Sequence, residues 1–192
     1  MKYLACLVLM VGAMAVGPQA QEAPVVDPVH RALDAVLDTY VRDGLVYYRA
    51  LRQERGRFDR YVSSLAGVDV DGWDARRKLA FWINAYNAFV LRTVIDHYPI
   101  RGRSSQYPVG SIRQVPGAFE KNVFRAAGRA VTLDQIEKDI IVPLGDARAL
   151  LALGRGAVGG ARLRSEAYDA DRLEEQLATA VRETVDRREI VF

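Results

Sequence analysis

The sequence contains almost no cysteine. Of its 192 residues only Cys6 carries a thiol, and it lies within the apolar N-terminal stretch. The remainder of the chain therefore cannot form disulfides, bind a metal through thiolates or use a thiolate as a nucleophile. We expect its stability to come from core packing instead.

Histidine and the common catalytic motifs are also scarce. His30 and His97 are the only imidazoles, and neither belongs to an H-E-x-x-H spacing. The sequence has no G-K-[ST] phosphate loop and no G-x-S-x-G nucleophile elbow. We therefore predict no metal site and no cofactor.

An excess of either charge is missing as well. Lysine and arginine together number 27 against 24 acidic residues, which gives a net charge of +3. The basic residues are interspersed with the acidic ones, whereas a nucleic-acid-binding protein shows a basic face or stripe. We predict no nucleic-acid partner.

The N-terminal segment is typical of a secretory signal peptide. Lys2 precedes an uncharged apolar run, and Ala20 provides a small residue for cleavage. The run is about 15 residues long, shorter than the ~20 that span a bilayer. We expect residues 1–20 to be removed and 21–27 to form a flexible lead. The protein should then work in the periplasm or outside the cell, without a stable membrane anchor.

The remaining 172 residues (192 minus 20) are enough for one domain, 28–192. Its most informative segment is 75–98, in which nearly every position from 79 to 91 is apolar or an amide. A helix that is apolar all round is a buried one, and Pro99 disfavours its continuation. We predict a central buried helix over 75–98.

The other patterns predict shorter elements around this helix. Residues 122–131 are typical of a hairpin that turns at Ala127-Gly128. Residues 149–153 are typical of a short strand, and residues 100–119 are typical of an irregular segment. Four further helices are predicted. The first runs from Asp27-Pro28 to Gly44 and carries His30 on its exposed face, and the second covers residues 51–65. The third follows a capping box formed by Thr132 and Gln135, and the fourth follows Asp169. The predicted fold is α+β: a helix-rich single domain around a buried central helix, with a small antiparallel sheet.

Four stretches occur in a suggestive order: YVRDGLVYYRAL, LAFWINAYNAFVLRTVIDHYPI, RAVTLDQIEKDIIVPL and ALLALGRGAVGGARLRSEAYDADRLEEQL. Together they resemble the family of the domain of unknown function 547 (DUF547) over roughly residues 30–185. The second stretch is the most specific, because two amides within an aromatic-rich helix are an uncommon combination. The resemblance implies a hydrolase-like scaffold and leaves the activity open.

The sequence departs from the family near its C-terminus. Typical members have approximately HFALNCAS…CPPLR where this chain has LLALGRGAVGGARLR. The position of the family's histidine is Leu150, that of its asparagine is Gly154, and those of its two cysteines are Arg155 and Gly160. If a family cysteine is the nucleophile, this chain lacks it.

Three residues of the central helix are candidate binding residues: Asn84, Tyr86 and Asn87. Asparagine is a poor helix former, and burying an unpaired amide costs ~1–3 kcal/mol, so the two amides need partners. They lie on one helix face. We favour a structural interpretation, in which the amides bridge to the backbone of neighbouring loops, over a ligand role.

His97 and Glu166 are the candidate catalytic residues. His97 lies too far along the helix from Asn84 for the two to hold one small ligand, at roughly 20 Å. It is either a general base or a residue whose ring bonds the last helix carbonyls. Glu166 is either a general base or a partner of Arg164.

The glycine-rich segment contains GRGAVG, a literal match to G-x-G-x-x-G. The match does not predict a dinucleotide site, because the following residues look extended and no helix begins there. Two interpretations stay open: an anion nest beside nearby arginines, or close backbone packing with the arginines paired to acidic residues. The candidate binding residues are Gly154, Arg155, Gly156, Arg162, Arg164 and Tyr168.

These observations favour an exported module that binds a small anionic ligand or a protein partner in the cell envelope. The alternative is a cysteine-independent hydrolase or transferase that uses His97 and Glu166 beside the glycine-rich segment. A third hypothesis is a structural component of an envelope complex, which would expose an apolar patch of a few hundred Å². One observation separates the binding hypothesis from the catalytic one: a catalytic site requires His97 and segment 154–164 to line the same cavity.

Overall fold

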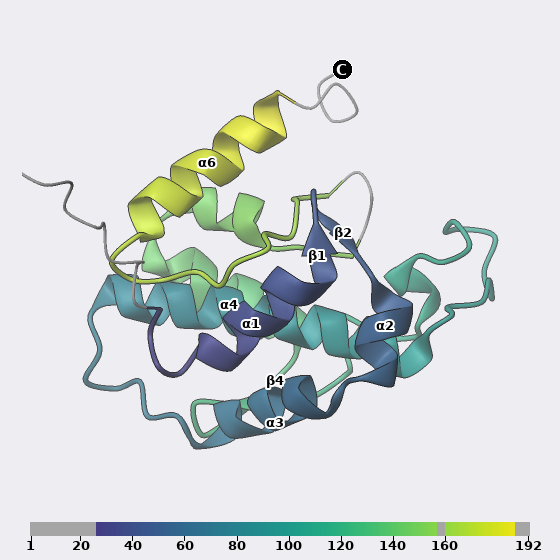
Figure 1. Ribbon diagram of the computed structural model, residues 1–192, viewed down its shortest axis with the longest axis horizontal. Coiled ribbons are helices and arrows are strands. Elements are labelled where there is room, and N and C mark those ends of the chain that lie inside the picture. Colours follow the sequence, from purple (N-terminus) through teal and green to yellow (C-terminus); the bar gives the residue numbers. More distant parts are fainter. Residues whose placement is uncertain (1–25, 157–159, 187–192) are drawn as a thin grey trace, which may run out of the picture.

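A computed structural model of the chain describes residues 26–156 and 160–186 (Figure 1). The predicted signal peptide and most of the predicted lead lie outside the described residues. The elements are α1 (Arg31–Tyr40), β1 (Val41–Arg42), β2 (Leu45–Val46), α2 (Tyr48–Gln53), α3 (Gly56–Ser64), η1 (Leu65–Gly67), α4 (Ala75–His97), η2 (Ile112–Gln114), β3 (Phe124–Ala126), β4 (Arg129–Val131), α5 (Leu133–Gln135), η3 (Ile136–Ile141), η4 (Val142–Leu144), η5 (Ala147–Ala152) and α6 (Leu173–Val185). The predicted helix-rich α+β fold is confirmed.

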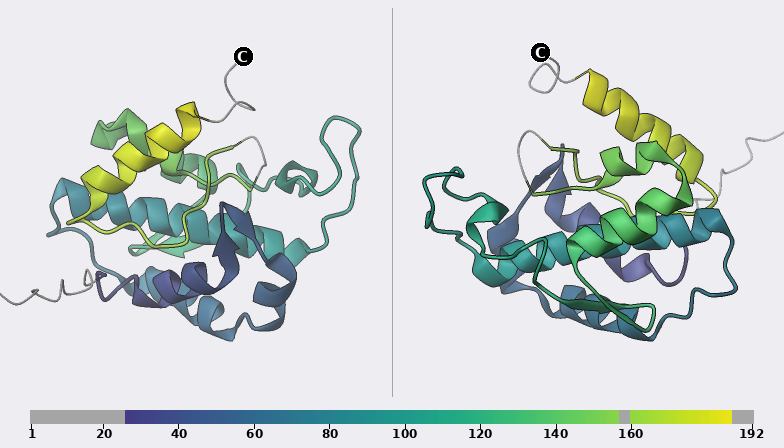
Figure 2. Two further views of the ribbon diagram at one scale, coloured as in Figure 1. Left: turned by 45° about the horizontal axis from the view of Figure 1, so that its top comes forward. Right: turned by 180° about the vertical axis from the view of Figure 1, so that it is seen from behind.

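Helix α4 is the centre of the domain. It begins behind Asp74, whose carboxylate accepts a hydrogen bond from the Arg77 N–H at 2.9 Å, and every residue from 79 to 91 is buried. Helices α2 and α3 contact it, as do α5, η3 and η5. Helix α1 lies in front of α4 in Figure 1, and the view from behind in Figure 2 shows the segment with η3 across its back. The prediction of a buried central helix is confirmed.

The hairpin predicted near residues 122–131 is also confirmed. β3 and β4 pair antiparallel, and Ala127 and Gly128 form the turn with φ of 49° and 69°. The N–H groups of these two residues donate to the carbonyls of Leu65 and Ala66, which ties the turn to η1. On the inner side Phe124 stacks on Phe89 of α4, with 4.4 Å between ring centroids.

Behind this hairpin the predicted capping box is present. The Thr132 hydroxyl accepts from the Gln135 N–H and the Gln135 side chain accepts from the Thr132 N–H. The helix that follows has only one α-helical turn before it widens into the π-helix η3. A π-helical turn of this kind is uncommon and is often found at functional sites.

A second small sheet, β1–β2, was not predicted. Gly44 was expected to end the first helix, but α1 ends at Tyr40, and Asp43 and Gly44 form a two-residue turn with φ of 51° and 78°. An Asp-Gly pair is a favoured hairpin turn, because both positions require positive φ. This hairpin forms one wall of the cleft described below.

The predicted strand over 149–153 is wrong. Residues 149–152 belong to the 3-10 helix η5, which Asp146 caps by accepting from the Arg148 N–H, and Leu153 directly follows it. A short apolar run fits a buried strand and a buried helical turn equally well, so its pattern could not separate them.

Three helix boundaries also differ from the prediction. Helix α1 begins at Arg31 instead of directly after Asp27, and the expected helix over 51–65 is divided into α2 and α3. Helix α6 begins at Leu173, because Asp169 uses its carboxylate to accept from the N–H groups of Asp27 and Asp171.

The irregular segment 100–119 contains the short helix η2 and is held by the buried amide of Gln114. The Gln114 Oε1 atom accepts from the N–H groups of Arg103 and Ser104, and its Nε2 atom donates to the carbonyls of Ser104 and Tyr107. One side chain thus satisfies backbone groups that lack partners in regular secondary structure.

His30 was predicted on a surface helix, but its side chain is buried, with 2% exposed. It precedes α1, and its ring packs against Phe81 while Nδ1 lies 2.9 Å from the Tyr61 hydroxyl. Burial lowers the pKa of His30 from 6.5 to about 4, although the charges of Asp27 and Asp169 oppose this shift. Arg77 acts in the same direction as burial.

The buried His30 predicts a pH-dependent stability. Because its pKa is about 4 in the fold and 6.5 unperturbed, the unfolded state binds more protons in this window. The free energy of unfolding should therefore fall as the pH drops from about 6.5 to about 4, by roughly 3 kcal/mol in all. Urea unfolding of the wild type and of His30→Leu across this range measures the difference in slope.

The exposed second histidine provides the control, since His97→Leu removes an imidazole without changing the core. We expect His97→Leu to keep the wild-type dependence on pH and His30→Leu to flatten it. If His30→Leu and the wild type lose stability in parallel between pH 7 and 4.5, His30 is not buried as a neutral imidazole.

Candidate functional site

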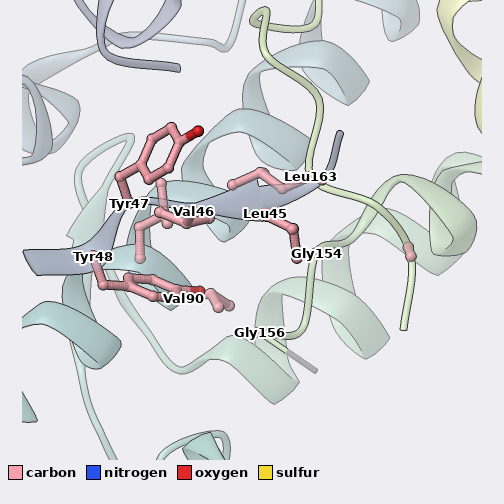
Figure 3. Close-up of a pocket in the computed structure, with 11 residues that line it drawn as sticks. Leu45, Val46, Tyr47, Tyr48, Val90, Gly154, Gly156 and Leu163 are labelled. Atoms are coloured by element: carbon pink, nitrogen blue, oxygen red, sulfur yellow. The ribbon is translucent and has the colours of Figure 1, made fainter. Parts of the chain in front are cut away.

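A cleft with a volume of about 420 Å³ lies between the β1–β2 hairpin and the glycine-rich segment (Figure 3). Its base is α4, and its walls come from the hairpin on one side and from two extended stretches on the other. The lining residues are Gly44, Leu45, Val46, Tyr47, Tyr48, Val90, Leu91, Gly154, Gly156, Ala161 and Leu163. Two of the predicted binding residues, Gly154 and Gly156, therefore lie in one cleft.

The two asparagines of α4 hold the wall opposite the hairpin, which we call the second wall, in place. The Asn87 Nδ2 atom donates to the Ala152 carbonyl at 3.1 Å, and its Oδ1 atom accepts from the Gly154 N–H at 2.8 Å. One turn away, Asn84 forms the same pair of bonds with a single residue, donating to the Tyr168 carbonyl and accepting from its N–H. The structural interpretation of the two amides is confirmed.

The segment around Tyr168 has further side-chain partners. Gln176 of α6 donates to the Ala167 carbonyl and accepts from the Asp169 N–H, both at 2.9 Å. Asp34 of α1 accepts from the Ala167 N–H. Segment 167–169 is thus bonded to three helices by side chains.

The glycines of the second wall permit close packing. A Cβ atom on Gly154 would lie 3.4 Å from the Leu163 side chain and 3.6 Å from the Asn87 Oδ1 atom. Gly156 has a φ of +63°, and a Cβ there would lie 3.5 Å from Val90. Since side chains rarely adopt this φ, the backbone at Gly156 requires glycine.

Two of the three nearby arginines are engaged in ion pairs. Arg155, at the position of a family cysteine, pairs with Glu137 of the π-helix η3 at 2.5 Å. Arg164 pairs with Glu166 at 2.6 Å. Arg162 is exposed and forms no ion pair within the described part of the chain. The geometry favours the packing interpretation over an anion nest that uses all three arginines.

Tyr86 lies on the buried side of the Arg155–Glu137 pair and not in the cleft. Burial raises the pKa of Tyr86 to about 12, while the neighbouring Arg155 guanidinium lowers it. Tyr86 is therefore a neutral core residue whose hydroxyl faces the ion pair.

The two candidate catalytic residues are not brought together. The His97 Nδ1 atom lies 2.8 Å from the Thr93 carbonyl, so the ring bonds the end of its own helix. His97 lines a separate cavity of about 470 Å³ with the segment after α4, including Arg101 and Arg103. Neither this cavity nor the cleft is lined by Glu166.

Glu166 is held by two arginines. Burial raises its pKa, but the hydrogen bond from Arg164 and the positive charges of Arg164 and Arg172 outweigh this and lower it. Its carboxylate oxygens accept from Arg164 and lie 2.9 Å from Arg172. A carboxylate stabilised in its charged form is a weak proton acceptor.

Sequence reasoning missed the hairpin wall of the cleft, including Leu45, Tyr47 and Tyr48. The available signal was the Asp43-Gly44 pair between the alternating residues of YVRDGLVYY. Figure 3 shows the Tyr48 ring reaching toward Val90, whereas the Tyr47 ring turns to the other side of the hairpin. Burial raises the pKa of Tyr48 to about 12.

Within residues 26–156 and 160–186, no group of three or more His, Cys, Asp or Glu side chains could hold a metal ion. In the same part of the chain, no helix combines the length and the apolar character needed to cross a membrane.

Comparison with known proteins gives one match. A sequence profile of the family described as "Protein of unknown function, DUF547" matches residues 70–184, which include α4, the glycine-rich segment and most of α6. Neither a search of curated proteins nor a search of solved structures found a match.

The asparagine clamps predict a specific loss of stability. Asn87→Leu keeps a similar volume but leaves the Gly154 N–H and the Ala152 carbonyl without partners, which should cost roughly 1–3 kcal/mol. Asn122→Leu is the matched control, since the Asn122 side chain forms no hydrogen bond within the described residues. We expect a lower urea midpoint for Asn87→Leu only. Equal midpoints for both variants would mean that the Asn87 bonds contribute nothing.

Proposed function

The chain belongs to the DUF547 family, and from this premise we propose that it is an exported domain that binds a small, largely apolar molecule in the cleft between the β1–β2 hairpin and the glycine-rich segment. The family description assigns no activity, so the proposal depends on the chemistry of the cleft.

The observation that carries the proposal is the composition of the lining. Its side chains are aliphatic or aromatic, and the hydroxyls of Tyr47 and Tyr48 are their only polar groups. The Tyr48 hydroxyl, which points into the cleft, is no ready general base, because burial raises its pKa to about 12. A cleft with apolar walls and few polar groups is typical of a binding site for a small molecule.

The size and the exposed rim support the same function. The volume of about 420 Å³ falls within the roughly 300–1,000 Å³ of small-molecule sites. At the rim Leu45 is 67% exposed and Tyr47 is 57% exposed. Leu45 extends the apolar wall beyond the cleft, so a ligand longer than the cleft would still find an apolar contact.

The alternative of a hydrolase or transferase receives less support. Its two candidate residues lack a common cavity, and each already has a bonding partner: the Thr93 carbonyl for His97, and two arginines for Glu166. The position of a family cysteine holds Arg155, whose guanidinium is engaged by Glu137. Binding without chemistry therefore fits the arrangement better.

A thermal-shift screen of the full chain against small apolar alcohols, amides and aromatic compounds tests the proposal. A ligand at a hundred times its dissociation constant adds ~2.7 kcal/mol to the free energy of unfolding. Ala161→Phe places a ring in the cleft and should abolish the shift. The matched control is Ala178→Phe on α6, outside the cleft lining, which should keep it.

The proposal fails if no compound raises the melting temperature. It also fails if Ala161→Phe and Ala178→Phe respond to the compounds as the wild type does.

A further inference from the structure

Of the two tyrosines that line the cleft, Tyr48 is the one that points into it. The Tyr48 ring reaches across the cleft toward Val90 and stacks against Tyr98, with 6.0 Å between centroids. Its hydroxyl forms no hydrogen bond within the described part of the chain. The hydroxyl stays accessible to solvent, so a ligand atom in this part of the cleft can accept a hydrogen bond from it.

Near the hairpin turn lies Arg162, which forms no ion pair within residues 26–156 and 160–186. The neighbours of Arg162, Ala161 and Leu163, both line the cleft, and the Arg162 stem packs on Gly44 at the hairpin turn. The distance from an ideal Gly44 Cβ to the Arg162 Cγ atom is only 2.9 Å. The Arg162 side chain is exposed beside the hairpin turn, whereas the charges of Arg155 and Arg164 are neutralised by glutamates.

We propose that the cleft selects an amphipathic carboxylate, with its anionic group at Arg162, its apolar body between the two walls and a hydrogen-bond acceptor beside the Tyr48 hydroxyl. This inference depends on the proposed function, since it names the class of ligand for the same cleft. Gly44, against which Arg162 packs, and Tyr48 are four residues apart, so their Cα atoms are separated by at most roughly 14 Å of extended chain. A ten-carbon acyl chain is of comparable length when extended.

Three probes separate the contributions: decanol, decanoate and ω-hydroxydecanoate. Decanol has the same apolar body with a neutral hydroxyl at one end, decanoate has a charged carboxylate there instead, and ω-hydroxydecanoate adds a hydroxyl at the far end as an acceptor. Isothermal titration calorimetry with the full chain at low ionic strength should show decanoate binding about fivefold more tightly than decanol. The ω-hydroxyl should add a further factor of about five, the contribution of one ordinary hydrogen bond.

Two variants assign these factors to residues. Arg162→Gln should reduce decanoate to the affinity of decanol and leave decanol unchanged. Arg129→Gln on β4 removes the same charge from an exposed arginine without an ion pair in the described residues, and should change nothing. Tyr48→Phe should remove only the advantage of the ω-hydroxyl.

The inference is overturned if decanol and decanoate bind the wild type equally, or if Arg162→Gln and Arg129→Gln weaken decanoate alike. If decanol still binds and Ala161→Phe blocks it, the proposed function stands while the ligand class falls. If none of the three probes binds, both fall.

Discussion

Buried carboxamide side chains take the place of a sheet in this domain. Asn84, Asn87 and Gln176 each donate to a backbone carbonyl and accept from a backbone N–H of the extended chain between η5 and α6. Backbone groups in a buried segment must be paired, and the described strands of the fold form only two short hairpins. The extended chain can therefore lie against α4 only because these amides pair its backbone groups. The wall of the cleft opposite the β1–β2 hairpin depends on them.

The same constraint determines how the side chains after η5 are directed. Asn87 fixes the backbone at Gly154, so the next side chain, Arg155, is directed to Glu137 and not into the cleft. Glycine at position 156 then permits the backbone to turn over Val90 with positive φ. Residues 154–156 thus contribute an ion pair and close backbone packing, and the cleft that they border has an apolar lining.

Local patterns in the sequence predicted local features well. The buried helix over 75–98, the hairpin at Ala127-Gly128 and the need of Asn84 and Asn87 for backbone partners all follow from composition and spacing within a few residues. The burial of His30 and the cleft wall at Tyr48 depend on contacts between segments that are distant in the sequence. No local pattern of apolar and polar residues indicates such contacts. The apolar run 149–153 was ambiguous because a short buried helix and a short buried strand share the same composition.

Amide hydrogen exchange at two positions tests the central claim most directly. The N–H groups of Gly154 and Tyr168 lie outside helices and strands, and each donates only to an asparagine side chain of α4, at 2.8 Å. If the carboxamides hold these segments, both amides will exchange with protection close to that of the buried middle of α4, because opening them requires opening the core. Exchange of Gly154 and Tyr168 at the rate of an unstructured peptide, while α4 stays protected, would contradict the account.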